Sequence, residues 1–204
     1  MKVVVLVVTL ISCAGDVMAS EAPSAIEQAY RAGKAASDDD VARRLYQHGI
    51  DLARQELVAR PDAPGALLWL AANLAGEALT HGKLFALRVI PEIESTLLRL
   101  EQTSPTFDHA AAARALANLY WKAPALISVG SSKKATAYFL LALERAPTFP
   151  GNQAMAAAYF AENRQCDRAR PLARAVSARG DLDSFGPDAA EWRQLAHDAL
   201  EDCH

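Results

Sequence analysis

Apolar residues along most of the chain recur every three or four positions, and prolines and glycines separate these segments. This spacing is typical of amphipathic helices that bury one face. After the first twenty residues, no segment alternates apolar and polar positions, and no Asn-Gly or Asp-Gly pair joins two β-branched runs. The sequence therefore predicts an all-α fold.

The first half of the chain contains several expected helix boundaries. Ser37 is expected to cap a helix whose first turn holds the aspartates at 38–40, where carboxylates interact favourably with the helix dipole. Pro61 and Pro64 end this helix and begin the next. The apolar positions of these two helices are Leu45, Leu52, Leu57, Leu67, Leu68, Leu70, Leu74 and Leu79.

Two further boundaries lie near the middle of the chain. The run His81-Gly82-Lys83 is typical of a helix C-terminus, because a cation favours the negative end of the dipole and glycine can reverse the chain. Pro91 is expected to open another helical stretch, and Pro105 to close it.

A structural repeat can be recognised in the second half of the sequence. Ala135, Phe139, Ala142 and Pro147 have the spacing of the second helix of a tetratricopeptide repeat, a helical hairpin of about 34 residues. Small residues let paired helices approach closely, an aromatic fills the gap between hairpins, and proline ends the helix. The matching positions of the first helix and of the next repeat are Leu116, Ala117, Tyr120, Ala156, Ala157, Phe160, Ala169, Ala173 and Val176. Pro171 is expected early in its helix, where a missing N–H does little harm.

The predicted architecture is therefore a stack of antiparallel helical hairpins, a tetratricopeptide-like solenoid, that ends in a capping helix over Asp188 to Leu200. Between Tyr120 and Ala135 the chain has six residues more than the standard repeat, within 121–130. Insertions of this kind usually lie on one face of a repeat protein, often the binding face.

The inserted segment is the main candidate for a binding site. It is unusually apolar for a loop and follows a tryptophan, a frequent interface anchor. The candidate partner- or ligand-binding residues are Tyr120, Trp121, Lys122, Pro124, Leu126 and Ile127. The alternative is that the insertion folds back and completes the core.

The N-terminus has the pattern of an export signal. Lys2 precedes an apolar run over 3–12 that is too short to span a bilayer, and Val17-Met18-Ala19 fits a cleavage site. This assigns 1–19 to a signal peptide and 20–204 to one helical domain. A second interpretation remains open, because Leu10-Ile11-Ser12-Cys13 fits a lipobox in which Cys13 is lipidated. The product is then periplasmic or exported, or is anchored by lipid to the outer membrane.

Composition narrows the function further. The net charge is -3 with no basic run, which argues against nucleic acid as a partner. Cys166 and Cys203 remain after the signal, and an even pair in an oxidising compartment favours a disulfide over two independent thiols.

The search for chemistry indicates no enzyme. Ser131 and Lys134 form an S-x-x-K, but the companion motifs of penicillin-recognising enzymes are absent, so a serine-capped helix is the simpler interpretation. The same helix start has features of an incidental anion site. The five histidines are scattered without metal-ligand spacing, so neither a metal nor a cofactor is expected: His48, His81, His109, His197 and His204.

With these residues in view, the chain resembles the tetratricopeptide superfamily and, more narrowly, the T component of TRAP transporters (TatT-like proteins). The resemblance rests on 87–93, on Tyr120-Trp121-Lys122-Ala123-Pro124 and on 130–135 followed by Ala146-Pro147. It implies a helical-repeat fold without catalytic residues or cofactor, docked to a periplasmic solute-binding protein. It also implies an oligomer with a cleft or channel for a small apolar ligand.

Three functions are consistent with these patterns. The first is an exported module that binds a protein partner in the cell envelope. The second is a carrier that holds a small apolar ligand between its helices. The third is a general scaffold for envelope assembly.

Overall fold

The computed structural model describes residues 24–203, so the predicted signal peptide and Cys13 lie outside the described residues. Within this range every regular element is helical. The elements are α1 (Ala25–Ala35), α2 (Asp39–Ala59), α3 (Pro64–His81), α4 (Lys83–Thr103), α5 (Phe107–Lys122), α6 (Ser132–Arg145), α7 (Pro150–Glu162), α8 (Cys166–Ser177), the 3₁₀-helix η1 (Leu182–Phe185) and α9 (Ala189–Glu201). The predicted all-α fold is confirmed.

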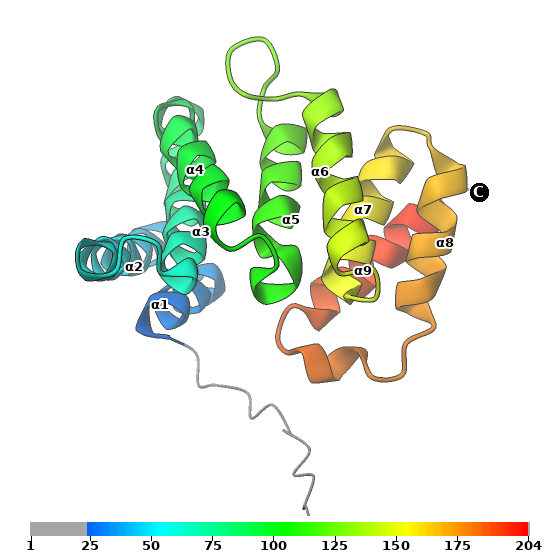
Figure 1. Ribbon diagram of the computed structural model, residues 1–204, viewed down its shortest axis with the longest axis horizontal. Coiled ribbons are helices and arrows are strands. Elements are labelled where there is room, and N and C mark those ends of the chain that lie inside the picture. Colours follow the sequence, from blue (N-terminus) through cyan, green and yellow to red (C-terminus); the bar gives the residue numbers. More distant parts are fainter. Residues whose placement is uncertain (1–23, 204) are drawn as a thin grey trace, which may run out of the picture.

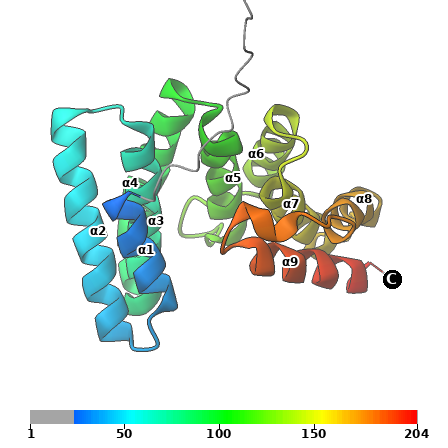
Figure 2. The same cartoon turned by 90° about the horizontal axis from the view of Figure 1, so that it is seen from below.

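The helices form a curved array of hairpins in two layers (Figure 1). The odd-numbered helices α1, α3, α5, α7 and α9 contact one another in sequence and form one layer. Each even-numbered helix packs against the odd-numbered helices that precede and follow it. Figure 2 shows α1 and α2 at one end of the array and α8 and α9 at the other. The arrangement is the predicted solenoid, and α9 is its capping helix.

Local sequence signals set most of the helix boundaries, with one shift in the first half. The side chain of Asp38, rather than that of Ser37, caps α2 by accepting a hydrogen bond of 2.9 Å from the Val41 amide. An aspartate is as good an N-cap as a serine and adds a charge at the positive end of the dipole. Pro64 begins α3, where its missing N–H leaves no intrahelical bond unmade.

The expected boundary at Pro91 is wrong, because α4 runs without a break from Lys83 to Thr103. Gly82, with φ of 86°, reverses the chain after α3, so the new helix starts eight residues before the proline. Pro91 is exposed, which leaves water free to satisfy the carbonyl that loses its partner. Pro171 is likewise inside α8 on an exposed face, further from the helix start than expected.

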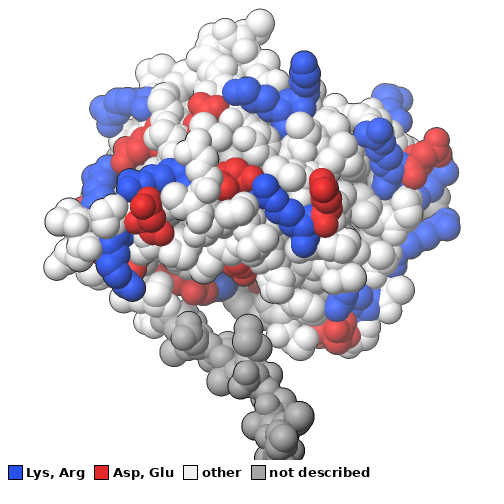
Figure 3. Space-filling model, in the orientation of Figure 1, with Lys and Arg blue, Asp and Glu red and all other residues white. Residues whose placement is uncertain are grey.

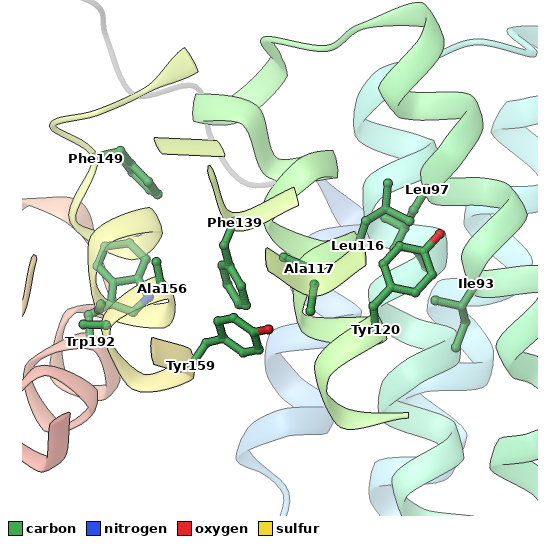
Figure 4. Close-up of a cluster of buried hydrophobic side chains, with 14 of the residues drawn as sticks. Ile93, Leu97, Leu116, Ala117, Tyr120, Phe139, Phe149, Ala156, Tyr159 and Trp192 are labelled. Atoms are coloured by element: carbon green, nitrogen blue, oxygen red, sulfur yellow. The ribbon is translucent and has the colours of Figure 1, made fainter. Parts of the chain in front are cut away.

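Most of the repeat positions identified in the second half lie in the core (Figure 4), whereas Pro147 is exposed at the end of α6. Phe139 is fully buried between α6 and α7, with its ring centroid 5.0 Å from that of Tyr159. The alanines at 117, 135, 156 and 157 are also fully buried, which lets neighbouring helices approach closely. Burial of a phenylalanine stabilises the fold by about 1.5–3 kcal/mol, so these contacts join the hairpins.

The start of α5 contains a left-handed turn that periodicity did not predict. Asp108, His109 and Ala110 have φ of 44°, 55° and 62°, a conformation that costs side-chain-bearing residues about 1–2 kcal/mol each. Asn152 holds this turn in place by donating to the His109 carbonyl at 3.1 Å and accepting from Arg114 at 2.9 Å. Burial lowers the pKa of Arg114, against the opposing effect of Asp108.

A disulfide joins Cys166 at the start of α8 to Cys203 after α9, with Cα atoms 5.3 Å apart. The Arg170 guanidinium donates to the Cys203 carbonyl at 2.8 Å, so a hydrogen bond supports the same junction. Together they fix the end of the described chain to the last hairpin.

Candidate functional site

The inserted segment forms the loop between α5 and α6, residues 123–131. Its neck is closed: the Ser131 amide donates to the Tyr120 carbonyl at 2.9 Å. At Gly130 an added Cβ would lie 2.0 Å from the Ala123 carbonyl oxygen, so only glycine fits this approach of two backbone segments. The loop is therefore a closed projection with a fixed base.

The tip of the loop is apolar and open to solvent. Leu126 is 98% exposed and Ile127 69% exposed, and Pro124 is exposed beside them. Val129, by contrast, packs back against the core. The loop thus returns one apolar side chain to the interior and presents the others at the surface. Figure 1 shows it as the highest point of the molecule, and in Figure 3 that point carries no charge.

Trp121 forms the base of the loop. The edge of its ring meets Phe139 and Tyr159, with centroid distances of 6.1 and 5.7 Å. The indole N–H donates to a Glu162 oxygen at 3.1 Å. The Lys122 ammonium lies 3.2 Å from the centroid of the same ring and 3.3 Å from the other Glu162 oxygen. Trp121 and Lys122 therefore tie the end of α5 to α7.

Tyr120 supports the site from within, because its side chain is 2% exposed. Its hydroxyl donates to Glu94 of α4 at 2.7 Å. Burial raises the pKa of Tyr120, and the hydrogen bond to Glu94 raises it further because that bond requires the protonated phenol. Tyr120 thus joins α4 to α5 and offers no surface to a partner.

The S-x-x-K segment forms the start of α6. Ser131 caps the helix by accepting from the Lys134 amide at 3.3 Å. The Lys134 ammonium lies 3.4 Å from Glu94 and 4.6 Å from the centroid of the Tyr120 ring. Serine and lysine are therefore engaged in a helix cap and an ion pair, which is the simpler of the two interpretations of the motif.

Two hollows lie away from the loop. One, of about 400 Å³, lies beside α8 and α9, where Arg179, Arg193 and His197 contribute to its lining. The other, of about 350 Å³, lies at the start of α5, where Asp108 and Arg145 contribute. Charged side chains contribute to the lining of both hollows.

The sequence predicts the turn between α3 and α4 as a helix boundary at His81-Gly82-Lys83, but not as a candidate site. Leu79 and Leu84, on either side of Gly82, are 87% and 86% exposed. The sequence feature that could have indicated this site is the pair Leu79 and Leu84, which lie three positions before and two positions after the helix-breaking Gly82. Such leucines are ordinarily assigned to a buried stripe, and only the arrangement of helices shows that these two face solvent.

Among residues 24–203 no three side chains of the metal-binding types gather closely enough to hold an ion. None of the helices in that range combines the length and apolarity needed to cross a membrane. Comparison with protein-family models and with curated proteins finds no match to the chain.

Proposed function

We propose that the chain is a non-catalytic helical-repeat module of the cell envelope that binds a partner protein through the α5–α6 loop. The observation that carries the proposal is the pair Leu126 and Ile127, exposed at the tip of a loop whose neck is closed. Two large apolar side chains held in water at the end of a fixed projection gain free energy when a partner covers them.

The rigid base supports this interpretation. Trp121, Lys122 and Glu162 fix the end of α5, so the tip needs little ordering when it binds. Ordering of interface segments is one of the main costs of association, and a prearranged loop avoids it. The family resemblance makes a periplasmic solute-binding protein the first partner to test.

Site-specific photo-cross-linking in the native envelope tests the proposal. A benzoylphenylalanine at position 126 is expected to cross-link one envelope protein reproducibly. The matched control carries the same group at position 58, because Val58 is 85% exposed on α2 and belongs to no projection. Absence of a specific product at 126, or equal products at 126 and 58, contradicts the proposal.

A further inference from the structure

The α3–α4 turn presents a second apolar projection. Leu79 and Leu84 flank Gly82 and point into solvent. The turn has its own support, because the rings of His81 and Phe85 stack with centroids 4.2 Å apart. The Arg88 guanidinium covers the Phe85 ring at 4.8 Å. The two leucines therefore stand on an ordered turn.

This turn and the α5–α6 loop lie at the same end of the molecule. Glu94 of α4 meets Tyr120 of α5, so these residues mark a common level. From Glu94 back to Lys83 is eleven residues (94 − 83), a helical rise of about 16 Å. The loop rises from Tyr120 in the same direction, and Figure 1 shows both projections at the top.

The two segments that form the projections carry only basic charge, although the whole chain has a net charge of -3. Residues 78–91 and 119–143 hold Lys83, Arg88, Lys122, Lys133 and Lys134 and no carboxylate. In Figure 3 both basic and acidic side chains lie below the uncharged tip.

Most of the carboxylates near these segments are engaged or buried. At the start of α2, Asp38 caps the helix and Asp40 pairs with Arg43, whose guanidinium reaches the Thr80 carbonyl at 3.5 Å, whereas Asp39 is exposed. Glu77 is 8% exposed. Glu94 pairs with Lys134, and Glu162 pairs with Lys122. Glu92 pairs with Arg54 of α2. Among the described residues Lys83, Arg88 and Lys133 form no ion pair, so the two projections themselves carry unpaired positive charge.

We propose that the α3–α4 turn and the α5–α6 loop form one docking edge, defined by Leu79, Leu84, Leu126, Ile127, Lys83 and Lys133, for a partner protein with an acidic surface. The inference rests on the proposed function and extends it by a second contact point and by the charge of the partner. The apolar tips enter hollows of the partner, and its carboxylates meet the lysines around them. Complementary charge of this kind speeds association and fixes orientation.

A folded protein fits this edge better than the two other possible occupants. The closed neck at Gly130 and the stacked turn at Phe85 hold the tips at a fixed separation, which matches a surface of fixed shape. A second copy joined edge to edge would bring lysines against lysines. A membrane surface is fluid, so a fixed separation of the two apolar tips would not strengthen binding to it.

The test uses the full chain in its native envelope, with benzoylphenylalanine at position 84, 126 or 58. We expect positions 84 and 126 to cross-link the same protein, within peptides rich in aspartate and glutamate, and position 58 to give no such product. The double variant Lys83→Glu/Lys133→Glu should lower the yield at both positions at least fivefold. The control Arg174→Glu, an exposed charge on α8, should leave it unchanged.

The outcomes separate the two proposals. A product at 126 without one at 84 overturns the common edge and leaves the proposed function standing, whereas no product at 126 overturns both. A yield that survives the charge reversal contradicts an acidic partner. Self-cross-linking at both positions assigns the edge to a second copy. Flotation of the purified chain with phosphatidylglycerol–phosphatidylethanolamine vesicles, lost in Leu84→Ser/Leu126→Ser, assigns it to a lipid surface.

Discussion

The Lys34 ammonium on the first helix lies 2.7 Å from the Glu191 carboxylate on the last helix. Asp188, just before α9, lies 3.3 Å from Lys34 and 3.6 Å from Arg31. Residues about 157 positions apart therefore meet, and the two ends of the solenoid are bridged by charge rather than left apart.

This bridge predicts a weak, salt-sensitive coupling between α1 and α9. Lys34 and Glu191 are about half exposed, so their interaction is worth about 0.2–1 kcal/mol. In a cycle of Lys34→Met, Glu191→Gln and the double variant, urea unfolding in dilute buffer should return a coupling of that size. In 1 M salt the coupling should disappear, because the screening length falls to about 3 Å. A coupling that is zero in dilute buffer, or unchanged by salt, contradicts the bridge.

Gly130→Ala is expected to open the neck of the α5–α6 loop. The new methyl group would overlap the Ala123 carbonyl, a backbone atom that cannot move without displacing the chain. Overpacking of this kind costs about 1–3 kcal/mol. We expect faster proteolysis within 123–131 and a lower free energy of unfolding.

The matched control for Gly130 is Gly180→Ala, since an added Cβ at Gly180 meets nothing within 4 Å. This variant should leave both the proteolysis rate and the free energy of unfolding close to those of the unaltered chain. Equal behaviour of the two variants would show that the neck is not closed as described.

Tyr120→Phe is expected to lower the free energy of unfolding near pH 7 by about 1 kcal/mol, since it removes the hydrogen bond to Glu94. The pKa of Tyr120 is raised in the folded chain, first by burial and then by that hydrogen bond. The folded state therefore holds the phenolic proton more tightly than the unfolded state, whose pKa is about 10.

The sign of the resulting pH dependence follows from linkage. Above about pH 10 the folded chain binds more protons than the unfolded chain, so stability falls as pH rises. The Phe variant lacks this contribution, and the other tyrosines affect both proteins alike. The stability difference between the two proteins, measured by urea unfolding at pH 7 and pH 10.5, should therefore narrow at the higher pH. A constant difference contradicts the assignment to Tyr120.

The disulfide between Cys166 and Cys203 is expected to stabilise the chain by about 2–4 kcal/mol, because it closes a long loop in the unfolded state. Replacing both cysteines by alanine should lower the free energy of unfolding by that amount. Adding reductant to the unaltered chain should lower its free energy of unfolding by the same amount. Adding reductant to the double variant should leave its free energy of unfolding unchanged. An unaltered chain that is indifferent to reductant contradicts this prediction.

The candidate site was only partly predictable from the sequence. The length of the insertion and its apolar residues located the loop, and they did so because a repeat of known period makes extra residues visible. The separate roles of Tyr120, buried against α4, and Leu126, exposed at the tip, followed from the structure. Exposure of a side chain beside a turn depends on neighbouring helices, which periodicity does not specify.

By itself the sequence determined the all-α fold, the hairpins of the second half and the position of the capping helix. Helical periodicity, caps and proline breaks are local properties, because each acts within about one or two turns. Only the tertiary structure decided that α4 passes through Pro91, that Asp108 to Ala110 are left-handed and that Lys34 reaches Glu191. The tertiary structure also places Leu84 and Leu126 at the same end of the molecule. These features depend on how helices cross and stack, and small angles at each hairpin add up along the solenoid before its ends meet.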